Sequence, residues 1–348
     1  MAAPRPPRAL VLALSVVLAA CSGAVASPSS PPAVPSPTAA PGSALPSLAP
    51  SPSPAAFPTT LTDDEGTAVT IASVPRKIVS LTPATTEILF ALGLGPSLVG
   101  RTGSDDFPPQ ASAIPVVASY TGVDVEKIVA ASPDLVLAGG DGFNPPADIA
   151  KLRSLHVPVL VVYAPTVEGV FDDIRLIGKA TGATGPANAL ADSMGRQFDA
   201  IRTATSGAEH PKVFYEIDAT SAIYTAADES FLAEMLSDAG GTPVTTGSTT
   251  DYAIPLEKLV AANPQVILLG DAAYGVTAGQ VEARSGWSTI AAVQSGSIFP
   301  IDDVVVTRPG PRLVLGLIDL VRVIHPELGI APLRTAVPTA SSAAPSGG

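Results

Sequence analysis

Few side chains in this 348-residue sequence are spaced for catalysis or metal binding. The three histidines, His156, His210 and His325, are isolated, and two of them end predicted helices, where an imidazolium complements the helix dipole. The pair Asp302-Asp303 could bind a metal ion, but adjacent carboxylates point in different directions, which favours a solvated loop. Motifs of zinc proteases, serine hydrolases, dithiol sites and nucleotide-binding loops are absent. The sequence therefore indicates a binding protein rather than an enzyme, with no metal site.

Aromatic side chains make up only 5% of the chain, yet they gather in segments that follow predicted strands. In open α/β sheets the ligand binds beyond the carboxyl ends of the strands. An isolated loop aromatic can equally cover its own core, so each position has two interpretations. The residues that we expect near a ligand are Ser104, Tyr120, Phe143, Tyr224, Tyr252 and Arg308.

Alternating strands and helices are predicted to position these loops. The predicted strands are apolar throughout, as in a parallel sheet that is buried on both faces. In the first half they lie at 77–81, 98–100, 135–138 and 159–163. One predicted helix begins near Thr82 or Thr85 and another after Asp124, all of which are suitable N-caps. This spacing favours βαβ units in a doubly wound sheet.

The pattern occurs twice. VEKIVAASPDLVLAGG, from residue 125, and LEKLVAANPQVILLGD, from residue 256, are identical at half of their positions. The predicted strands KIVSL, from residue 77, and KVFYEI, from residue 212, are separated by nearly the same distance along the chain as the two repeated segments. This indicates two copies of one α/β lobe. We expect the N-terminal lobe over 72–185, a single long helix over 186–208 and the C-terminal lobe over 209–330.

Both ends of the chain have the composition of processed or unstructured segments. Residues 1–20 carry two arginines, an apolar run and then small residues, the layout of a secretory signal peptide. The lone cysteine, Cys21, resembles the lipidated cysteine of bacterial lipoproteins, so we expect a lipid anchor. Residues 21–58 and 333–348 are rich in Pro, Ser and Ala and predict a disordered tether and tail. The net charge of −12 argues against nucleic-acid binding.

Several segments together resemble one protein family, the periplasmic binding proteins for cobalamin, haem and iron-siderophores, which are the solute receptors of ABC importers. The similar segments are RKIVSLTPATTEILFALGLGPSLVG, FPPQA, VEKIVAASPDLVLAGG, KLRSLHVPVLVV and TRPGPRL. The resemblance covers about residues 72–328 and is nearest to the cobalamin-binding branch. It implies two Rossmann-like α/β lobes with parallel-type sheets, joined by one long helix, with the ligand cleft between the lobes.

The resemblance also implies partners. In the cobalamin branch one glutamate on each lobe contacts arginines of the dimeric permease, and Glu126 and Glu257 match these positions. A glutamate in a first helical turn also complements the helix dipole, by about 0.3–1 kcal/mol, so both roles stay open. The expected protein is a monomeric receptor on the outer face of the cell membrane, which serves a permease dimer with its ATPase subunits.

For the ligand, the resemblance ranks a corrinoid first, haem second and a ferric siderophore third. Tyr120, Tyr224 and Arg308 match ligand-lining positions of the cobalamin branch. Ser104, Gly139 and Asp251 instead stand where a cobalamin receptor has large aromatics. Haem would use a tyrosine such as Tyr120 as its axial ligand, and siderophores would prefer a basic cleft. Alternatives of another class are a two-lobe metal-cluster scaffold, an enzyme or an extracytoplasmic sensor.

Overall fold

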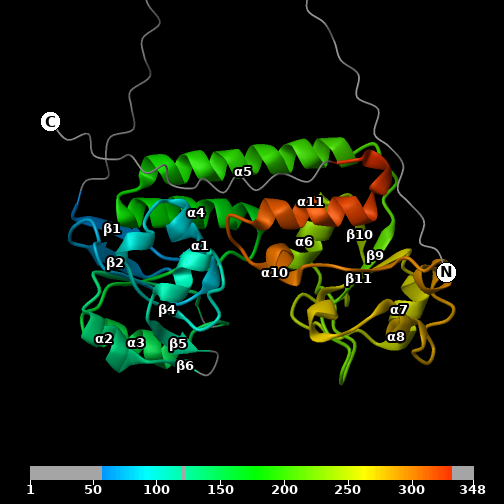
Figure 1. The fold of residues 1–348 in the computed structure, drawn as a ribbon, viewed down its shortest axis with the longest axis horizontal. Helices are drawn as coiled ribbons and strands as arrows, with labels where there is room; N and C mark the ends of the chain where they lie inside the picture. The colour runs from blue at the N-terminus through cyan, green and yellow to red at the C-terminus, as the bar shows by residue number, and fades with distance from the viewer. Residues whose placement is uncertain (1–56, 120–121, 141, 331–348) are drawn as a thin grey trace, which may run out of the picture. The chain divides into compact units, whose positions relative to one another are not determined.

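The computed structural model describes residues 57–119, 122–140 and 142–330 (Figure 1). The predicted signal peptide, Cys21, Tyr120 and the predicted tail lie outside the described residues, as does most of the predicted tether. We call residues 57–181 the N-lobe and residues 212–330 the C-lobe. Each contains its own sheet of mainly parallel strands, which confirms the predicted fold class of two α/β lobes.

The N-lobe sheet has the strand order β6-β5-β4-β3-β7-β8, and all neighbours are parallel except β5 and β6. Its strands are β3 (Ile78–Ser80), β4 (Leu98–Thr102), β5 (Val116–Ser119), β6 (Gly122–Val123), β7 (Leu135–Ala138) and β8 (Val159–Val161). Every residue of β3, β7 and β8 is buried, as the unbroken apolar runs predicted. The helices of this lobe are α1 (Pro83–Ala91), α2 (Val125–Ala131), α3 (Pro146–Ser154) and α4 (Val167–Thr181).

The C-lobe sheet has the strand order β10-β9-β11-β12, and all its pairs are parallel. Its strands are β9 (Lys212–Glu216), β10 (Thr242–Pro243), β11 (Val266–Leu269) and β12 (Ile298–Pro300). Its helices are α6 (Phe231–Asp238), α7 (Leu256–Ala262), α8 (Ala278–Glu282), α9 (Ala291–Ser295), α10 (Asp303–Thr307) and α11 (Leu313–Ile324). Short 3-10 turns lie at Gly95–Ser97, Pro109–Ala113, Gly270–Tyr274 and Pro326–Leu328.

The connecting helix α5 spans Thr184–Thr205, close to the predicted 186–208. It begins after Gly182, whose positive φ of 77° ends α4 in a left-handed turn. In Figure 1 α5 runs alongside α4 and α11. Phe198 of α5 and Phe171 of α4 are buried, with their rings 5.6 Å apart and edge to face. The connecting helix is therefore packed against the N-lobe.

The duplicated sequence forms the same local structure in both lobes. Helix α2 ends at Ser132 and helix α7 ends at Asn263, and both of these residues have left-handed backbone angles, with φ of 50° and 51°. A proline follows each of them and prevents the helix from continuing. The chain then enters the fully buried strands β7 and β11.

A β-hairpin precedes the expected start of the N-lobe. Strands β1 (Thr59–Thr62) and β2 (Ala68–Ile71) pair antiparallel, and neither strand was predicted from the sequence. Asp63 organises the turn by accepting hydrogen bonds from the backbone N–H groups of Glu65 and Thr67, and it pairs with Arg153 at 2.7 Å. The folded lobe therefore starts near residue 59. Over the described ranges, no helix combines the length and the hydropathy that a membrane span requires.

Candidate functional site

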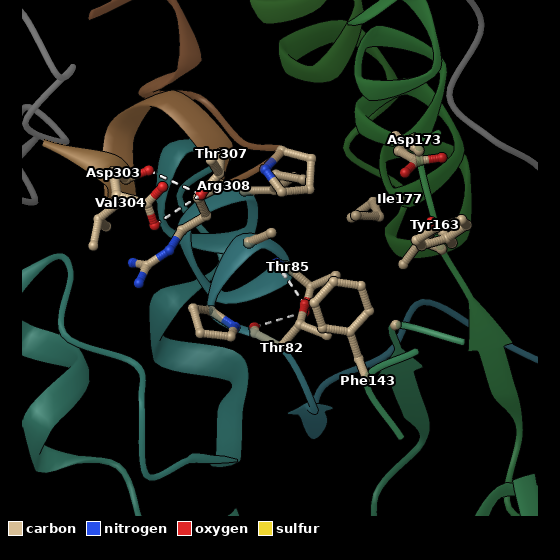
Figure 2. Close-up of a pocket in the computed structure, with 17 residues that line it drawn as sticks. Thr82, Thr85, Phe143, Tyr163, Asp173, Ile177, Asp303, Val304, Thr307 and Arg308 are labelled. Atoms are coloured by element: carbon tan, nitrogen blue, oxygen red, sulfur yellow. Dashed lines mark hydrogen bonds between the residues drawn. The ribbon is translucent and has the colours of Figure 1, made fainter. Parts of the chain in front are cut away.

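A cavity of about 240 Å³ is lined by residues of both lobes, and we call it the first cavity (Figure 2). On the N-lobe side its aromatic wall consists of Phe143, which follows β7, and Tyr163, which follows β8. Their ring centroids lie 6.1 Å apart at an interplanar angle of 52°. Phe143 is 59% exposed and Tyr163 is 49% exposed. Two aromatic rings left open to solvent at the carboxyl ends of parallel strands are available to a flat ligand.

Hydroxyl groups at the start of α1 also line the first cavity. Thr82 caps the helix, because its Oγ1 accepts a hydrogen bond of 3.2 Å from the backbone N–H of Thr85. The two threonine hydroxyls lie 3.0 Å apart, and the hydroxyl of Ser80 lies 2.6 Å from that of Thr85. The network holds Thr82 and Thr85, which both line the first cavity, in fixed positions.

Asp173 of α4 also lines the first cavity, although it is largely buried. Burial, and then the nearby carboxyl group of Asp64, raise the pKa of Asp173 to about 9. At neutral pH its side chain is therefore a neutral acid that can donate a hydrogen bond. The Asp64 carboxylate itself accepts a hydrogen bond of 2.6 Å from the backbone N–H of Tyr163, which holds this residue in place.

Helix α10 supplies the C-lobe wall. Asp302 caps it by accepting a hydrogen bond of 3.1 Å from the Val304 N–H, whereas Asp303 lines the first cavity. The buried hydroxyl group of Tyr215 donates to Asp303 Oδ1 at 2.8 Å. Thr307 donates to the Asp303 backbone carbonyl at 2.8 Å. The interpretation of Asp302-Asp303 as solvated loop charge is therefore wrong for Asp303, which is half-buried and hydrogen-bonded.

A second cavity, of about 290 Å³, is lined by residues of the C-lobe alone. Asp303 and Thr307 line both cavities, so α10 is their common wall. The remaining lining residues of the second cavity are Ile217, Ser230, Phe231, Leu232 and Tyr252. The predicted ligand residue Tyr252 thus lies at a cavity, about half-exposed.

The predicted ligand residue Arg308 lines the first cavity, but its charge is already paired. Its Nη1 donates to Glu87 Oε1 at 2.7 Å and to Asp106 Oδ1 at 2.6 Å. Figure 2 shows its guanidinium group directed away from Phe143 and Tyr163. Partial burial opposes ionisation of Asp106, but the hydrogen bond and the charge of Arg308 hold the pKa of this carboxyl below its usual value.

Arg312 completes this inter-lobe ion-pair cluster, which consists of Glu87, Asp106, Arg308 and Arg312. It donates from Nε and Nη2 to the two oxygens of Glu87 at 2.9 and 2.6 Å. Its guanidinium group also lies 4.3 Å from the ring centroid of Phe107. Glu87 belongs to α1 and both arginines belong to the C-lobe, so the cluster links the lobes beside the first cavity.

The other predicted ligand residues lie away from these two cavities. Tyr224 is half-buried and forms isolated β-bridges with Asp218 and Ala253. Ser104 is exposed, and its backbone N–H donates to Thr102 Oγ1 at 3.2 Å. The ligand roles of these two residues, like that of Tyr120, stay predictions.

Sequence reasoning missed Tyr163 and Asp173. Tyr163 is the last residue of the predicted strand 159–163, whereas β8 ends at Val161, so the rule that selected aromatics after strands was not applied to it. Asp173 is one of several acidic residues of α4, and its position in the sequence does not distinguish it. Its role depends on Asp64, which lies far away in the sequence.

The predicted docking residues Glu126 and Glu257 lie in the first turns of α2 and α7. Both side chains are exposed, and within the described ranges neither carboxylate takes part in an ion pair. Among those residues, no group of three or more His, Cys, Asp or Glu side chains is arranged to hold a metal ion. None of the three histidines lines either cavity.

Comparison with known proteins agrees with this architecture. Residues 78–305 match the family model of the periplasmic binding proteins. The uncharacterized ABC transporter substrate-binding lipoprotein YvrC of Bacillus subtilis is 37% identical over 276 residues, which cover 78% of this chain and 87% of the relative. The vitamin B12-binding protein of Vibrio cholerae is 29% identical over 238 residues, which cover 68% of this chain and 84% of that protein.

A solved structure of the periplasmic haem-binding protein BhuT, in complex with two haems, is also similar. Its TM-score is 0.66 at 26% sequence identity, and the match covers 72% of this chain and 98% of BhuT. The two-lobe fold, the family match over 78–305 and the relatives of nearly full coverage agree with one another. This chain therefore belongs to the periplasmic binding protein family.

Proposed function

We propose that this chain is the extracytoplasmic solute-binding protein of an ABC importer and that it captures a corrinoid between its lobes. The family match and the relatives named for ABC transport and for vitamin B12 binding support this proposal. The observation that carries the choice of ligand is the state of Arg308. Among the described residues that line the two cavities, Arg308 alone is cationic. Its guanidinium group is paired with Glu87 and Asp106.

A cleft without a free cation suits a ligand with a neutral periphery. Haem carries two propionates and ferric catecholate siderophores carry net negative charge, so both would meet Asp303 without a compensating cation. A corrin ring instead carries amide side chains, which can exchange hydrogen bonds with hydroxyl groups such as those of Thr82 and Thr307. The exposed rings of Phe143 and Tyr163 offer an apolar surface for the macrocycle.

Haem is the second candidate, because two phenol groups reach the cavities. Tyr163 lines the first cavity and Tyr252 lines the second, and a tyrosine can serve as an axial ligand of haem iron. The similarity to the haem-bound structure of BhuT favours the same candidate. An axial tyrosine ligand would give a characteristic absorbance spectrum, which separates this alternative from corrinoid binding.

Purified protein without its first 20 residues would be titrated with cyanocobalamin, haemin and a ferric hydroxamate, followed by calorimetry and absorbance. We expect cyanocobalamin to bind, and Tyr163→Ala to weaken its binding about tenfold through loss of a stacked aromatic ring. Tyr274→Ala is the matched control, because Tyr274 is 90% exposed and lines neither cavity. Binding of haemin but of no corrinoid would replace the assigned ligand.

Glu126 and Glu257 are the proposed contacts with the permease. Their equivalent positions in the two lobes and their exposed, unpaired carboxylates support this role, since each could pair with an arginine of one permease subunit. Changing both residues to alanine should abolish uptake of the ligand by cells and leave its affinity for the purified protein unchanged. Glu282→Ala, at an exposed glutamate of α8, should leave both unchanged.

The proposed location is the outer face of the cell membrane. Cys21 would carry a lipid, and the Pro-rich segment after it would hold the lobes away from the bilayer. The name of the Bacillus subtilis relative as a lipoprotein supports this location. Cys21→Ser should release the protein from the membrane fraction of cells, which immunoblotting would detect.

A further inference from the structure

The common wall of the two cavities carries one carboxylate, Asp303, that no cation of the described residues neutralises. The ionisable residues that line the cavities, tyrosines aside, are Asp173, Asp303 and Arg308. Asp173 keeps its proton at neutral pH, because burial and Asp64 raise its pKa to about 9. Asp303 accepts its hydrogen bond from Tyr215, a neutral phenol, and takes part in no ion pair of the described chain.

The two nearby arginines are balanced by two other carboxylates. Arg308 and Arg312 share Glu87, and Arg308 also contacts Asp106 at 2.6 Å. The inter-lobe ion-pair cluster is therefore neutral as a whole, and Asp303 leaves one net negative charge at the cleft. Because Tyr215 is fully buried and fixes Oδ1 at 2.8 Å, this charge has a defined place on the wall of both cavities.

We propose, building on the corrinoid function above, that Asp303 makes the cleft select corrinoids by charge. Corrinoids of the cobinamide type lack the nucleotide loop and therefore its phosphodiester, so they are more positive than cobalamin by one charge. A ligand that binds against α10 would place its macrocycle near Asp303, which lines both cavities. The negative phosphodiester of cobalamin would then be repelled by the Asp303 carboxylate, because no free cation lies beside it among the described lining residues. Asp303 is thus a residue that determines specificity, and a cationic, phosphate-free corrinoid is the preferred cargo.

The test compares aquacyanocobinamide with cyanocobalamin by calorimetry in the wild-type protein and in three variants. Asp303→Asn keeps an oxygen that can accept from Tyr215 and removes the charge. Asp106→Asn leaves the Arg308 charge partly uncompensated, and the Asp106 side chain is 59% exposed, so the variant should fold as the wild type does. Asp302→Asn is the matched control, because Asp302 is exposed, lines neither cavity, and asparagine also caps a helix.

We expect the preference for cobinamide, the ratio of the two dissociation constants, to fall roughly tenfold in Asp303→Asn. This is the effect of a unit charge about 6 Å away at an effective dielectric constant of about 40. Asp106→Asn should change the ratio in the same direction, Asp302→Asn should preserve it, and added salt should weaken the wild-type preference. The ratio is used because contacts of the nucleotide base are the same in every variant.

A change of less than about twofold in Asp303→Asn, with native thermal unfolding, would overturn the selection by charge. An equal change in the Asp302→Asn control would also overturn it, because the effect would then come from net charge. Failure of both corrinoids to bind the wild-type protein would overturn the proposed function itself. Binding of both with an unchanged ratio in Asp303→Asn would leave that function intact and refute only the role of Asp303.

Discussion

The carboxylate of Glu87 should contribute more to stability than any other single group near the cleft. Its side chain is only 2% exposed, and it accepts three hydrogen bonds of 2.6 to 2.9 Å from Arg308 and Arg312. In Glu87→Gln the amide nitrogen would face a guanidinium donor, and two arginines that are 16% and 17% exposed would lose their shared counter-charge. Removing one partner of a buried ion pair costs about 3–5 kcal/mol. Asp106 still compensates Arg308, so we expect about 3 kcal/mol.

Thermal and urea unfolding of the purified protein would measure this loss. For a folded region of this size about 1 kcal/mol corresponds to about 2 °C, so the midpoint of Glu87→Gln should fall by about 6 °C. The double variant Glu87→Gln/Arg312→Met removes an uncompensated charge together with its partner, and it should recover part of the loss. Glu282→Gln serves as the exposed control and should stay within about 0.5 kcal/mol of wild type.

Two results would refute this reasoning. A loss below about 1 kcal/mol in Glu87→Gln would mean that the cluster behaves like an exposed ion pair. Additive losses in the double variant would mean that Glu87 and Arg312 do not interact as the distances of 2.6 and 2.9 Å require.

Two further predictions concern buried carboxyl groups. The folded protein holds a proton on Asp173 up to about pH 9, whereas the unfolded chain releases it near pH 4, so stability should fall as pH rises through this range. Burial, and then the charge of Glu216, raise the pKa of Asp271 to about 7. Above pH 7 the remaining fall of the unfolding free energy with pH is therefore due to Asp173, at up to about 1.4 kcal/mol per pH unit. Asp173→Asn should abolish the slope between pH 7 and 9 in urea unfolding, and an unchanged slope would contradict the assignment. Arg284→Met should lower the unfolding free energy by about 3 kcal/mol in the same assay, because the fully buried Glu216 would lose its two hydrogen bonds of 2.5 and 2.7 Å to that arginine. A loss of less than about 0.5 kcal/mol would show that this ion pair does not stabilise the fold.

Most of the strands and helices of the two lobes could be predicted from local sequence. The run LVLA coincides with strand β7, and Asp124 caps α2 as predicted. Thr82, one of the two predicted candidates, caps α1. These elements have strong local signals, namely unbroken apolar runs, capping side chains and proline stops. The duplicated segment was informative for the same reason, because both copies form a helix, a left-handed turn and a buried strand.

Helix α10 was not predicted, because its sequence DVVVT has the β-branched composition of a strand. Tertiary packing overrides this preference. The α-carbon of Gly316 in α11 approaches α10 so closely that a Cβ there would lie 2.2 Å from the Val305 carbonyl oxygen. Only glycine allows this contact, which packs α11 against α10, the helix that carries Asp303 and Thr307. The common wall of the site therefore depends on a residue outside it.

The role of Arg308 depends on partners that its local sequence cannot reveal. As an isolated arginine at a cleft it favours an anionic ligand, but Glu87, 221 positions away, and Asp106 turn its charge into a link between the lobes. The sign of the charge that remains at the cleft then comes from Asp303, which the sequence presented as half of an ordinary acidic pair. A substitution at Glu87 or Asp106, neither of which lines either of the two cavities, would leave the charge of Arg308 only partly compensated at the cleft. Ligand preference in such a receptor can therefore change without any change in the residues that touch the ligand.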